Sequence, residues 1–349
     1  MSRAWLAPEL RFARTRRDWA TTFQIARRVA PGPHRDQLPW GVLLPVRNFT
    51  WDILPALLDL VERVRSGRGE GQGPWWRRTF REVLGQPGLD PEANCLLLEE
   101  GGEVQGFCLI FPELPVGRTV LELETAPHLV GSLAEREVLR QGVARARELG
   151  ARVAHLCLPQ RSPRRELLEQ EGFSRVCVYW EMVWRQERVP PVSLPHGFSV
   201  RPLEAGDAPT LTAVQNAAFA GSWGFCPNTV EQVQYRSAMT NTSPRGILFL
   251  CHGERVAGYC WTSVAPVEGQ TRGLISMVGV VPDYRRRGVG RPVLLAGMEY
   301  LRSIGVDDIG LNVDRNNTPA IRLYTSVGFQ KMRELHWFEF SLGAAAPAR

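Results

Sequence analysis

The sequence contains one pattern twice, and this repeat limits the folds that the chain can adopt. Two apolar runs enclose a charged, glycine-bearing turn at 96–111 (LLLEEGGEVQGFCLIF), and the same arrangement returns at 248–263 (LFLCHGERVAGYCWTS), 152 residues later. A second pair, LLEQEGF at 167–173 and LYTSVGF at 323–329, lies 156 residues apart. Because ordered matches at nearly one spacing indicate a repeated architecture, we expect two copies of one unit.

The repeat predicts how the chain is divided. Five segments follow from it: an N-terminal extension (1–40), a first copy (41–188), a linker (189–195), a second copy (196–342) and a tail (343–349). The linker region reads ERVPPVSLPHG, and its prolines predict a semi-rigid connection.

The second copy alternates strand and helix patterns. Strands are predicted at 198–203, 247–263 (as a hairpin), 274–281, 309–313 and 335–340, and helices at 207–220, 228–238, around Leu294 to Leu301 before Gly305, and at 318–326 after Asn317. The first copy permits the same order. Both copies are therefore predicted to be α/β units with a mixed sheet.

One strand-to-helix turn in the second copy combines positive charge with glycine. Its residues are Arg285, Arg286, Arg287, Gly288, Val289, Gly290 and Arg291. Exposed backbone N–H groups and the positive end of the helix dipole favour an anion there, and glycine lets the ligand come close. The motif is neither GxxxxGK[ST] nor GxGxxG, so ATP and dinucleotides are not predicted. A solvated basic turn is the alternative.

Two motifs in the second copy together resemble the GNAT superfamily of acyl-CoA-dependent N-acetyltransferases. The turn matches the family's [RQ]xxGx[GA] loop, and NNTPAIRLYTSVGF (316–329) matches its NxxAxxLYxxxGF helix. The resemblance is close over about 150 residues and weak over the first copy, and the chain is similar to tandem two-module members. It implies acetyl-CoA as co-substrate, no metal, and a loop that holds the pyrophosphate of coenzyme A.

The resemblance also implies roles for residues outside the loop. Val278, Gly279 and Val280 would pair with pantetheine through their backbone, and Asn317 would bind it, cap the helix, or do both. Gly279 inside a strand indicates a bulge or a close backbone approach, with relief of packing as the alternative. Tyr324 would be the general acid, since a phenol with a pKa of ~10 stays protonated at neutral pH. A plain core aromatic is the alternative for Tyr324.

The acceptor side is less defined. No carboxylate lies on the strand 274–281, so the general base is left open among Asp207, Glu231, Asp314 and an ordered water. Three aromatic residues, Phe219, Trp223 and Phe225, line an acceptor pocket or pack between the copies. We expect transfer of the acetyl group to a primary amine of a small metabolite. A protein or peptide acceptor and a non-catalytic acyl-CoA sensor are the alternatives.

The first copy departs from the family pattern. Its turn reads HLVGSLAERE, Leu168 stands at the position of Tyr324, and PQRSP replaces the segment with Asn317. We therefore expect a degenerate copy that takes the place of a second subunit, in a monomer that is a pseudo-dimer or in a homodimer. Binding of CoA by this copy is left open.

Composition and charge limit the classes of partner that the sequence predicts. The formal charge is +6, but Lys331 is the single lysine, and residues 1–40 hold eight arginines against three acidic residues, so neither nucleic acid nor a membrane is predicted as a partner. Seven cysteines without a CxxC pair indicate free thiols in a reducing compartment rather than a metal site. No run of 18 apolar residues occurs, so no membrane span is predicted, and the free thiols make the cytoplasm the expected location.

Overall fold

The computed structural model describes residues 44–66, 74–267 and 270–343. The predicted N-terminal extension and all of the tail beyond Gly343 lie outside these ranges. The first part of the chain forms β1 (Val46–Asn48), η1 (Trp51–Ile53), α3 (Leu54–Ser66), α4 (Pro74–Leu84), α5 (Pro91–Asn94), β2 (Cys95–Glu100), β3 (Glu103–Glu113), η2 (Leu114–Val116), β4 (Arg118–Thr125), η3 (Pro127–Leu129), α6 (Leu133–Glu148), β5 (Val153–Pro159), α7 (Arg165–Gln170) and β6 (Ser174–Trp184). The second part forms β7 (Phe198–Pro202), α8 (Ala208–Phe219), α9 (Val230–Ser237), β8 (Thr242–His252), β9 (Arg255–Val267), β10 (Gln270–Val280), η4 (Pro282–Tyr284), α10 (Gly290–Ser303), β11 (Asp308–Asp314), α11 (Thr318–Val327) and β12 (Gln330–Ser341).

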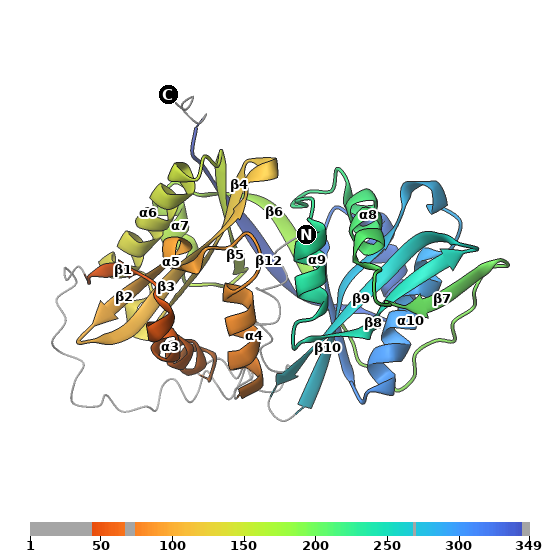
Figure 1. Cartoon of the computed structure of the whole chain (residues 1–349). Helices are drawn as coiled ribbons and strands as arrows, with labels where there is room; N and C mark the ends of the chain where they lie inside the picture. Colours follow the sequence, from red (N-terminus) through yellow and green to blue (C-terminus); the bar gives the residue numbers. More distant parts are fainter. Residues whose placement is uncertain (1–43, 67–73, 268–269, 344–349) are drawn as a thin grey trace.

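The strands of the described residues form one continuous sheet, and the two copies exchange their last strands within it (Figure 1). The order is β1-β2-β3-β4-β5-β12-β6-β11-β10-β9-β8-β7. β6 belongs to the first copy in sequence, yet it pairs antiparallel with β11, while β12 pairs antiparallel with β5. β6 and β12 also pair with each other at the centre. Each copy therefore completes the sheet of the other.

The helices cover both faces of the sheet. Core residues of β12 such as Phe338 pack with α6 and α7, and core residues of β6 such as Trp184 pack with α10 and α11. These four helices lie on one face, which we call the loop face because the arginine- and glycine-rich turn leads into α10. α3, α4, α8 and α9 pack on the opposite face, which we call the acceptor face. The exchanged strands thus supply core side chains to the partner copy.

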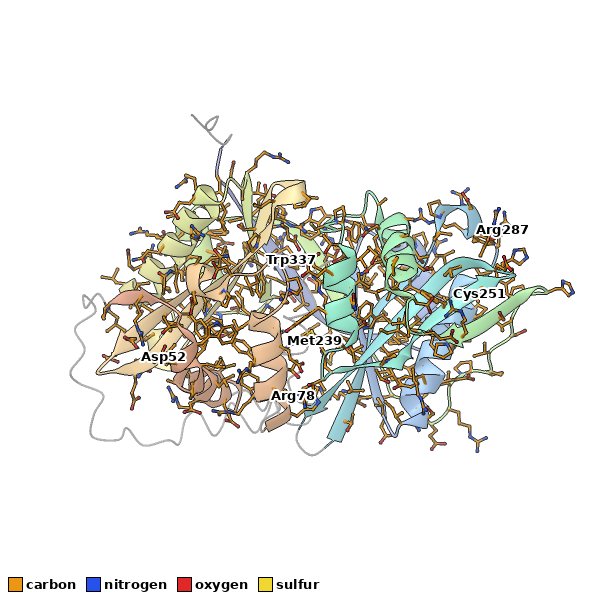
Figure 2. The ribbon with its side chains drawn as sticks, viewed as in Figure 1. Asp52, Arg78, Met239, Cys251, Arg287 and Trp337 are labelled. Carbon is orange, nitrogen blue, oxygen red and sulfur yellow. The ribbon has the colours of Figure 1, made fainter. Side chains whose placement is uncertain are left out.

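Direct contacts join the copies on the acceptor face. The Tyr235 hydroxyl donates to the Glu82 carbonyl oxygen at 2.8 Å, and the backbone N–H of Thr240 donates to the Glu82 carboxylate at 2.8 Å. At the centre, Trp337 of β12 packs with Tyr179 of β6, and it lies between the two halves in Figure 2. The linker residues from 185 to 197 have no regular secondary structure.

The predicted α/β class with a mixed sheet is confirmed. β10 pairs parallel with β11 and antiparallel with β9, and the predicted elements of the second copy appear in the expected order. Asn317 caps α11 as expected, because its side-chain oxygen accepts from the backbone N–H of Ala320 at 3.2 Å.

Candidate functional site

The sheet of the second copy opens between two neighbouring strands. The parallel pairing of β10 with β11 ends at Leu274 and Gly310, although β10 continues to Val280 and β11 to Asp314. Over this stretch β10 stays paired with β9 alone. The second edge of β10, from Ile275 to Val280, therefore has backbone groups that an extended ligand can bind.

The irregularity in β10 lies three residues before Gly279. The register shifts between Ile275 and Met277, so the bulge lies at Ser276, whose hydroxyl is 2.6 Å from that of Ser263. Gly279 keeps regular pairing with Tyr259, so of the alternatives given for this glycine the bulge does not hold. Gly279 is instead a close approach, since a Cβ there would lie 2.9 Å from the Cβ of Ala218 on α8.

The loop before α10 has the geometry of an anion site. Arg286 (φ 62°) and Gly288 (φ 74°) both adopt left-handed backbone conformations, and Arg286 is the single non-glycine residue among those described that does so. Val289, the N-cap of α10, makes no side-chain capping bond. Within the described ranges, the backbone N–H groups from Arg286 to Arg291 have no acceptor. Such N–H groups at a helix N-terminus bind phosphate.

Two arginines of the loop donate hydrogen bonds that connect the loop to neighbouring elements. Arg285 donates from Nε to the Val280 carbonyl oxygen at 3.2 Å and from a terminal nitrogen to that of Ala218 at 2.9 Å. Arg291 donates to the Ser326 hydroxyl at 2.9 Å and so joins α10 to α11. These two side chains hold the loop in place. The backbone N–H groups of the loop are left to bind an anion, and the two guanidinium groups add positive charge around them.

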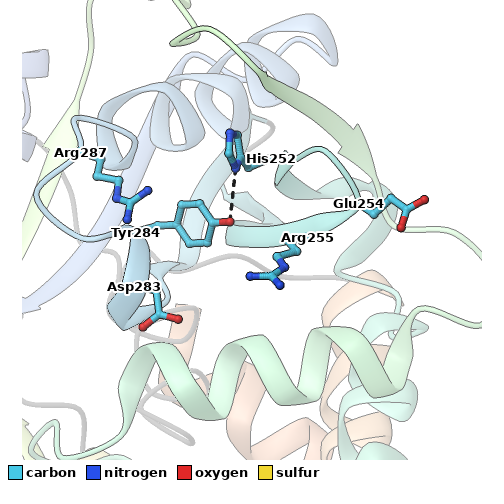
Figure 3. A pocket seen from close by; sticks show the side chains of 6 residues that line it. All are labelled: His252, Glu254, Arg255, Asp283, Tyr284 and Arg287. Carbon is cyan, nitrogen blue, oxygen red and sulfur yellow. Dashed lines mark hydrogen bonds between the residues drawn. The ribbon is translucent and has the colours of Figure 1, made fainter.

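Arg287 points toward an open pocket beside the loop. Its guanidinium carbon lies 5.1 Å from the centre of the Tyr284 ring, and the Tyr284 hydroxyl forms a hydrogen bond of 3.4 Å with Nδ1 of His252 (Figure 3). The pocket has a volume of about 800 Å³ and is lined by His252, Glu254, Arg255, Asp283, Tyr284 and Arg287. Arg287 is thus part of both the loop and this mixed-charge pocket.

Tyr324 lies on the loop face, on the helix that follows β11. Its side chain is 8% exposed, and burial raises the pKa of the phenol well above its ordinary value. The opening in the sheet, the loop and α11 meet at one place, because a Cβ added to Gly290 would lie 3.6 Å from Leu323 and 3.9 Å from Val280. The structure therefore brings together Val280, Gly290 and the helix of Tyr324.

The three aromatic residues of the predicted acceptor pocket separate into two groups. Phe219 and Phe225 are buried and stack on each other, with ring centres 5.8 Å apart, in the core between α8 and the sheet. Trp223 stacks on His155 of the first copy at 5.4 Å, and its carbonyl oxygen accepts from the Tyr179 hydroxyl at 3.3 Å. Trp223 thus joins the two copies, which is the alternative that the sequence left open.

The acceptor face holds a polar row that sequence reasoning missed. Asn312 on β11, Glu181 on β6 and Arg333 on β12 are register partners across three strands. Arg333 donates from Nε to the fully buried Glu181 carboxylate at 2.5 Å. Oδ1 of Asn312 and one terminal nitrogen of Arg333 are buried and have no hydrogen-bond partner among the described residues. The signal available in the sequence was Glu181, a charged residue inside the apolar run VYWEMVW. Only strand exchange, however, brings Glu181 beside Asn312 and Arg333.

The three carboxylates considered as general base are placed differently. Asp207 accepts from Arg201 at 2.5 Å, an ion pair that lowers the pKa of its carboxyl group. Glu231 lies in the first turn of α9, and Asp314 ends β11 and accepts from the backbone N–H of Asn316 at 2.9 Å. Of the three, only Asp314 is on a strand that borders the opening.

Other features of the described residues bear on cofactors. All seven cysteines are buried and free. No group of three or more His, Cys, Asp or Glu side chains in these ranges is arranged to hold a metal ion. None of the helices described is both long enough and apolar enough to cross a membrane.

Comparisons with known proteins relate this geometry to acetyltransferases. Residues 209–329 match the acetyltransferase (GNAT) family. A mycothiol acetyltransferase of Kocuria rhizophila is 31% identical over 305 residues, which is 80% of this chain and 95% of that protein. Another, of Thermobispora bispora, is 33% identical over 253 residues, or 68% and 81% of the two chains.

Solved structures show the same fold. A GCN5-related N-acetyltransferase of Sphaerobacter thermophilus superposes with a TM-score of 0.67 at 19% identity, covering 88% of this chain and 99% of that one. A tandem GNAT protein from the clavulanic acid biosynthesis pathway superposes with a TM-score of 0.65 at 16% identity, covering 88% and 100%. At these identities the likeness concerns the fold alone.

Proposed function

The chain belongs to the GNAT acetyltransferase family, and we propose that its second copy transfers an acetyl group from acetyl-CoA to a primary amine of a small metabolite. The observation that carries the proposal is the convergence of the open edge of β10, the uncapped loop at α10 and the helix of Tyr324. The N–H groups of Arg286 to Arg291 fit a pyrophosphate, and the free edge of Val278 to Val280 fits the amides of pantetheine. The name of the relatives, mycothiol acetyltransferase, supports a small-molecule acceptor.

The reaction is direct attack. The neutral amine forms a bond to the acetyl carbonyl carbon, the carbon–sulfur bond breaks, and the leaving thiolate needs stabilisation. Burial keeps the Tyr324 phenol protonated. Since the conjugate acid of a thiolate has a pKa of ~8.5, full proton transfer from Tyr324 is uphill, and the phenol acts chiefly by donating a hydrogen bond as negative charge develops on sulfur. The proton lost by the amine leaves through Asp314 or water.

The acceptor enters from the acceptor face. Oδ1 of Asn312 and the terminal nitrogen of Arg333, which have no partner among the residues that the structure describes, would bind polar groups of the acceptor, and Glu181 would hold the Arg333 guanidinium in place. Phe219 and Phe225 would form the apolar wall beneath α8, against which Gly279 packs. Burial of unsatisfied polar groups costs free energy, so such groups are typical of ligand sites.

Calorimetric titration of acetyl-CoA into the full chain tests the donor site. We expect one binding event, and the combined change Arg287→Ala and Gly288→Glu should abolish it because it removes charge and blocks the loop. Arg245→Ala, which removes one exposed arginine away from the loop, is the matched control and should leave binding unchanged. Absence of binding by the unaltered chain would refute the proposal.

A further inference from the structure

The first copy carries a buried glutamate where the second copy has the last glycine of its loop. TAPHLV (125–130) and VVPDYR (280–285) align at a spacing of 155 residues. Continuing this alignment places Glu135 at the position of Gly290, in the first turn of the equivalent helix, α6. Glu135 is 0% exposed. The position that is a glycine in one copy is thus charged and fully enclosed in the other.

A second small residue of the donor site has been replaced by the opposite charge. RSPRRELL (161–168) aligns with NTPAIRLY (317–324) at a spacing of 156 residues, and the proline is common to both. Arg164 therefore stands at the position of Ala320, and its side chain is 6% exposed. Arg164 donates from Nε to Oε1 of Glu135 at 2.6 Å. The two replacements are partners of one buried ion pair.

The Glu135 carboxylate accepts the hydrogen bonds that a phosphate would accept. The backbone N–H of Gly131, in the loop, donates to Oε2 at 2.6 Å, and the Thr125 hydroxyl, at the end of β4, donates to Oε1 at 2.7 Å. Arg164 completes the set. An anion held by a loop N–H, a hydroxyl and a guanidinium at a helix N-terminus is the arrangement of a phosphate site, with the anion supplied by the chain.

The carboxylate lies in the space that Gly290 keeps open in the second copy. A Cβ on Gly290 would point at Val280 and Leu323, 3.9 and 3.6 Å away. Val280 corresponds to Thr125 in the alignment, and Glu135 does point at Thr125. The same direction from the same backbone position therefore leads into the donor site in one copy and into the ion pair in the other.

Helix capping alone does not account for Glu135. Ser132 and Glu135 have the spacing of a capping box, and the Ser132 hydroxyl accepts from the backbone N–H of Glu135 at 3.1 Å. The Ser132 N–H, however, donates to the Leu129 carbonyl oxygen, and the Glu135 side chain turns inward to Arg164. The N–H groups of Gly131, Ser132 and Glu135 thus have acceptors within the chain, whereas α10 has no side-chain cap among the described residues.

The charges around Arg164 also distinguish the first copy from the second, whereas an opening between strands is common to both. Glu124 also lies 3.4 Å from Arg164, so two carboxylates contact this guanidinium, whereas the loop of the second copy holds four arginines. The strand opening itself persists, since the parallel pairing of β4 with β5 ends at Leu121 and Leu156. The first copy thus keeps the opening between its strands but not the arginines of the second copy's loop.

We propose that Glu135 is a built-in anion that closes the donor site of the first copy, so that the chain binds one acetyl-CoA, in the second copy. The inference rests on the proposed function of the second copy. It explains why the ion pair is buried at the cleft: Glu135 and Arg164 replace the ligand, and Leu168, 0% exposed at the position of Tyr324, fills the remaining space.

The number of acetyl-CoA sites per full-length chain, measured by calorimetry, tests the proposal. Glu135→Gly with Arg164→Ala should raise the number from one to two. Both partners are removed together because a single change would leave an unpaired buried charge. Gly290→Glu with Ala320→Arg, which transfers the ion pair to the second copy, should reduce the number to zero. Thermal unfolding of each variant verifies that it is folded.

The outcomes separate the inference from the proposed function. Two sites in the unaltered chain, or one site remaining after Gly290→Glu with Ala320→Arg, would overturn the closed first copy. A folded Glu135→Gly, Arg164→Ala variant that still binds one acetyl-CoA would overturn the role of the ion pair. No site in the unaltered chain would instead overturn the proposed function of the second copy.

Discussion

The Tyr324 hydroxyl is the side-chain group on which the proposed chemistry depends most. Tyr324→Phe keeps the buried ring and removes the donor to the leaving thiolate. We expect turnover to fall by ~10²–10⁴-fold, with acetyl-CoA affinity unchanged within ~2-fold because the phenol is not part of the loop. Release of free thiol from acetyl-CoA in the presence of an accepted amine measures turnover. Tyr300→Phe on α10 is the matched control, and equal turnover of Tyr324→Phe and the unaltered chain would exclude the assigned role.

Asn317 combines two roles that one substitution separates. Asn317→Asp keeps an oxygen that can accept from the N–H of Ala320, so the stability of the chain should be preserved. It removes the amide donor and adds a negative charge near the ligand, so acetyl-CoA affinity should fall at least ~10-fold if the amide binds pantetheine. Asn317→Ala should lower the free energy of unfolding by ~1 kcal/mol. Unchanged affinity in Asn317→Asp would leave the helix cap as the whole role.

At the scale of elements, the contact of β10 with α8 depends on the missing side chain of Gly279. A Cβ there would lie 2.9 Å from Ala218 and 3.0 Å from the Phe219 ring. Gly279→Ala should therefore push α8 from the strand and lower the free energy of unfolding by ~1–3 kcal/mol. Urea unfolding measures this change. Gly290→Ala, whose Cβ would meet its nearest neighbour at 3.6 Å, is the control and should be close to neutral; equal effects of the two changes would contradict the packing account.

At the scale of the whole molecule, strand exchange should keep the copies together without the linker. A protease site placed at Ser193 and Leu194, where Leu194 is 37% exposed, would permit cleavage between the copies. Because β12 stays paired with β5 and β6 with β11, we expect the cleaved protein to elute with the size of the intact chain under native conditions and to give two fragments only after denaturation. Fragments that separate on native chromatography would contradict the exchange.

Because its thiols are buried, the protein is expected to lose stability at alkaline pH. Burial raises the pKa of Cys108 and of Cys177 to about 12, whereas an exposed thiol has a pKa of ~8.5. Between these values the folded state binds more protons than the unfolded state, so the free energy of unfolding decreases as pH rises. Urea unfolding at pH 7.5, 9 and 10 should show this decrease. Cys108→Ala with Cys177→Ala should reduce the slope, and an unchanged slope would exclude these thiols as its source.

Short-range patterns in the sequence are enough to predict most of the local structure and to propose a donor loop. Turn chemistry and hydrophobic period act over a few residues. Such short-range patterns underlie the repeat, the order of elements in the second copy, the cap at Asn317 and the loop from Arg285 to Arg291. The two motifs of the second copy are enough to indicate the family. The sequence left a bulge and a close approach open at Gly279, and the bulge lies at Ser276 because it is set by pairing with β9 rather than by the glycine itself.

Which copy each of the two last strands completes depends on tertiary contacts. β6 and β12 occupy equivalent positions in the repeat, so both have the pattern of a strand that can pair beside β5 or β11, and no local signal chooses between them. Their exchange brings Glu181 next to Asn312, and it places Trp223 against His155. The burial of Glu135 is likewise a tertiary property. Its sequence context is typical of a helix cap, and Arg164, the partner toward which its side chain turns, is 29 residues away in sequence. Pairing and burial depend on distant segments, which short-range patterns do not encode.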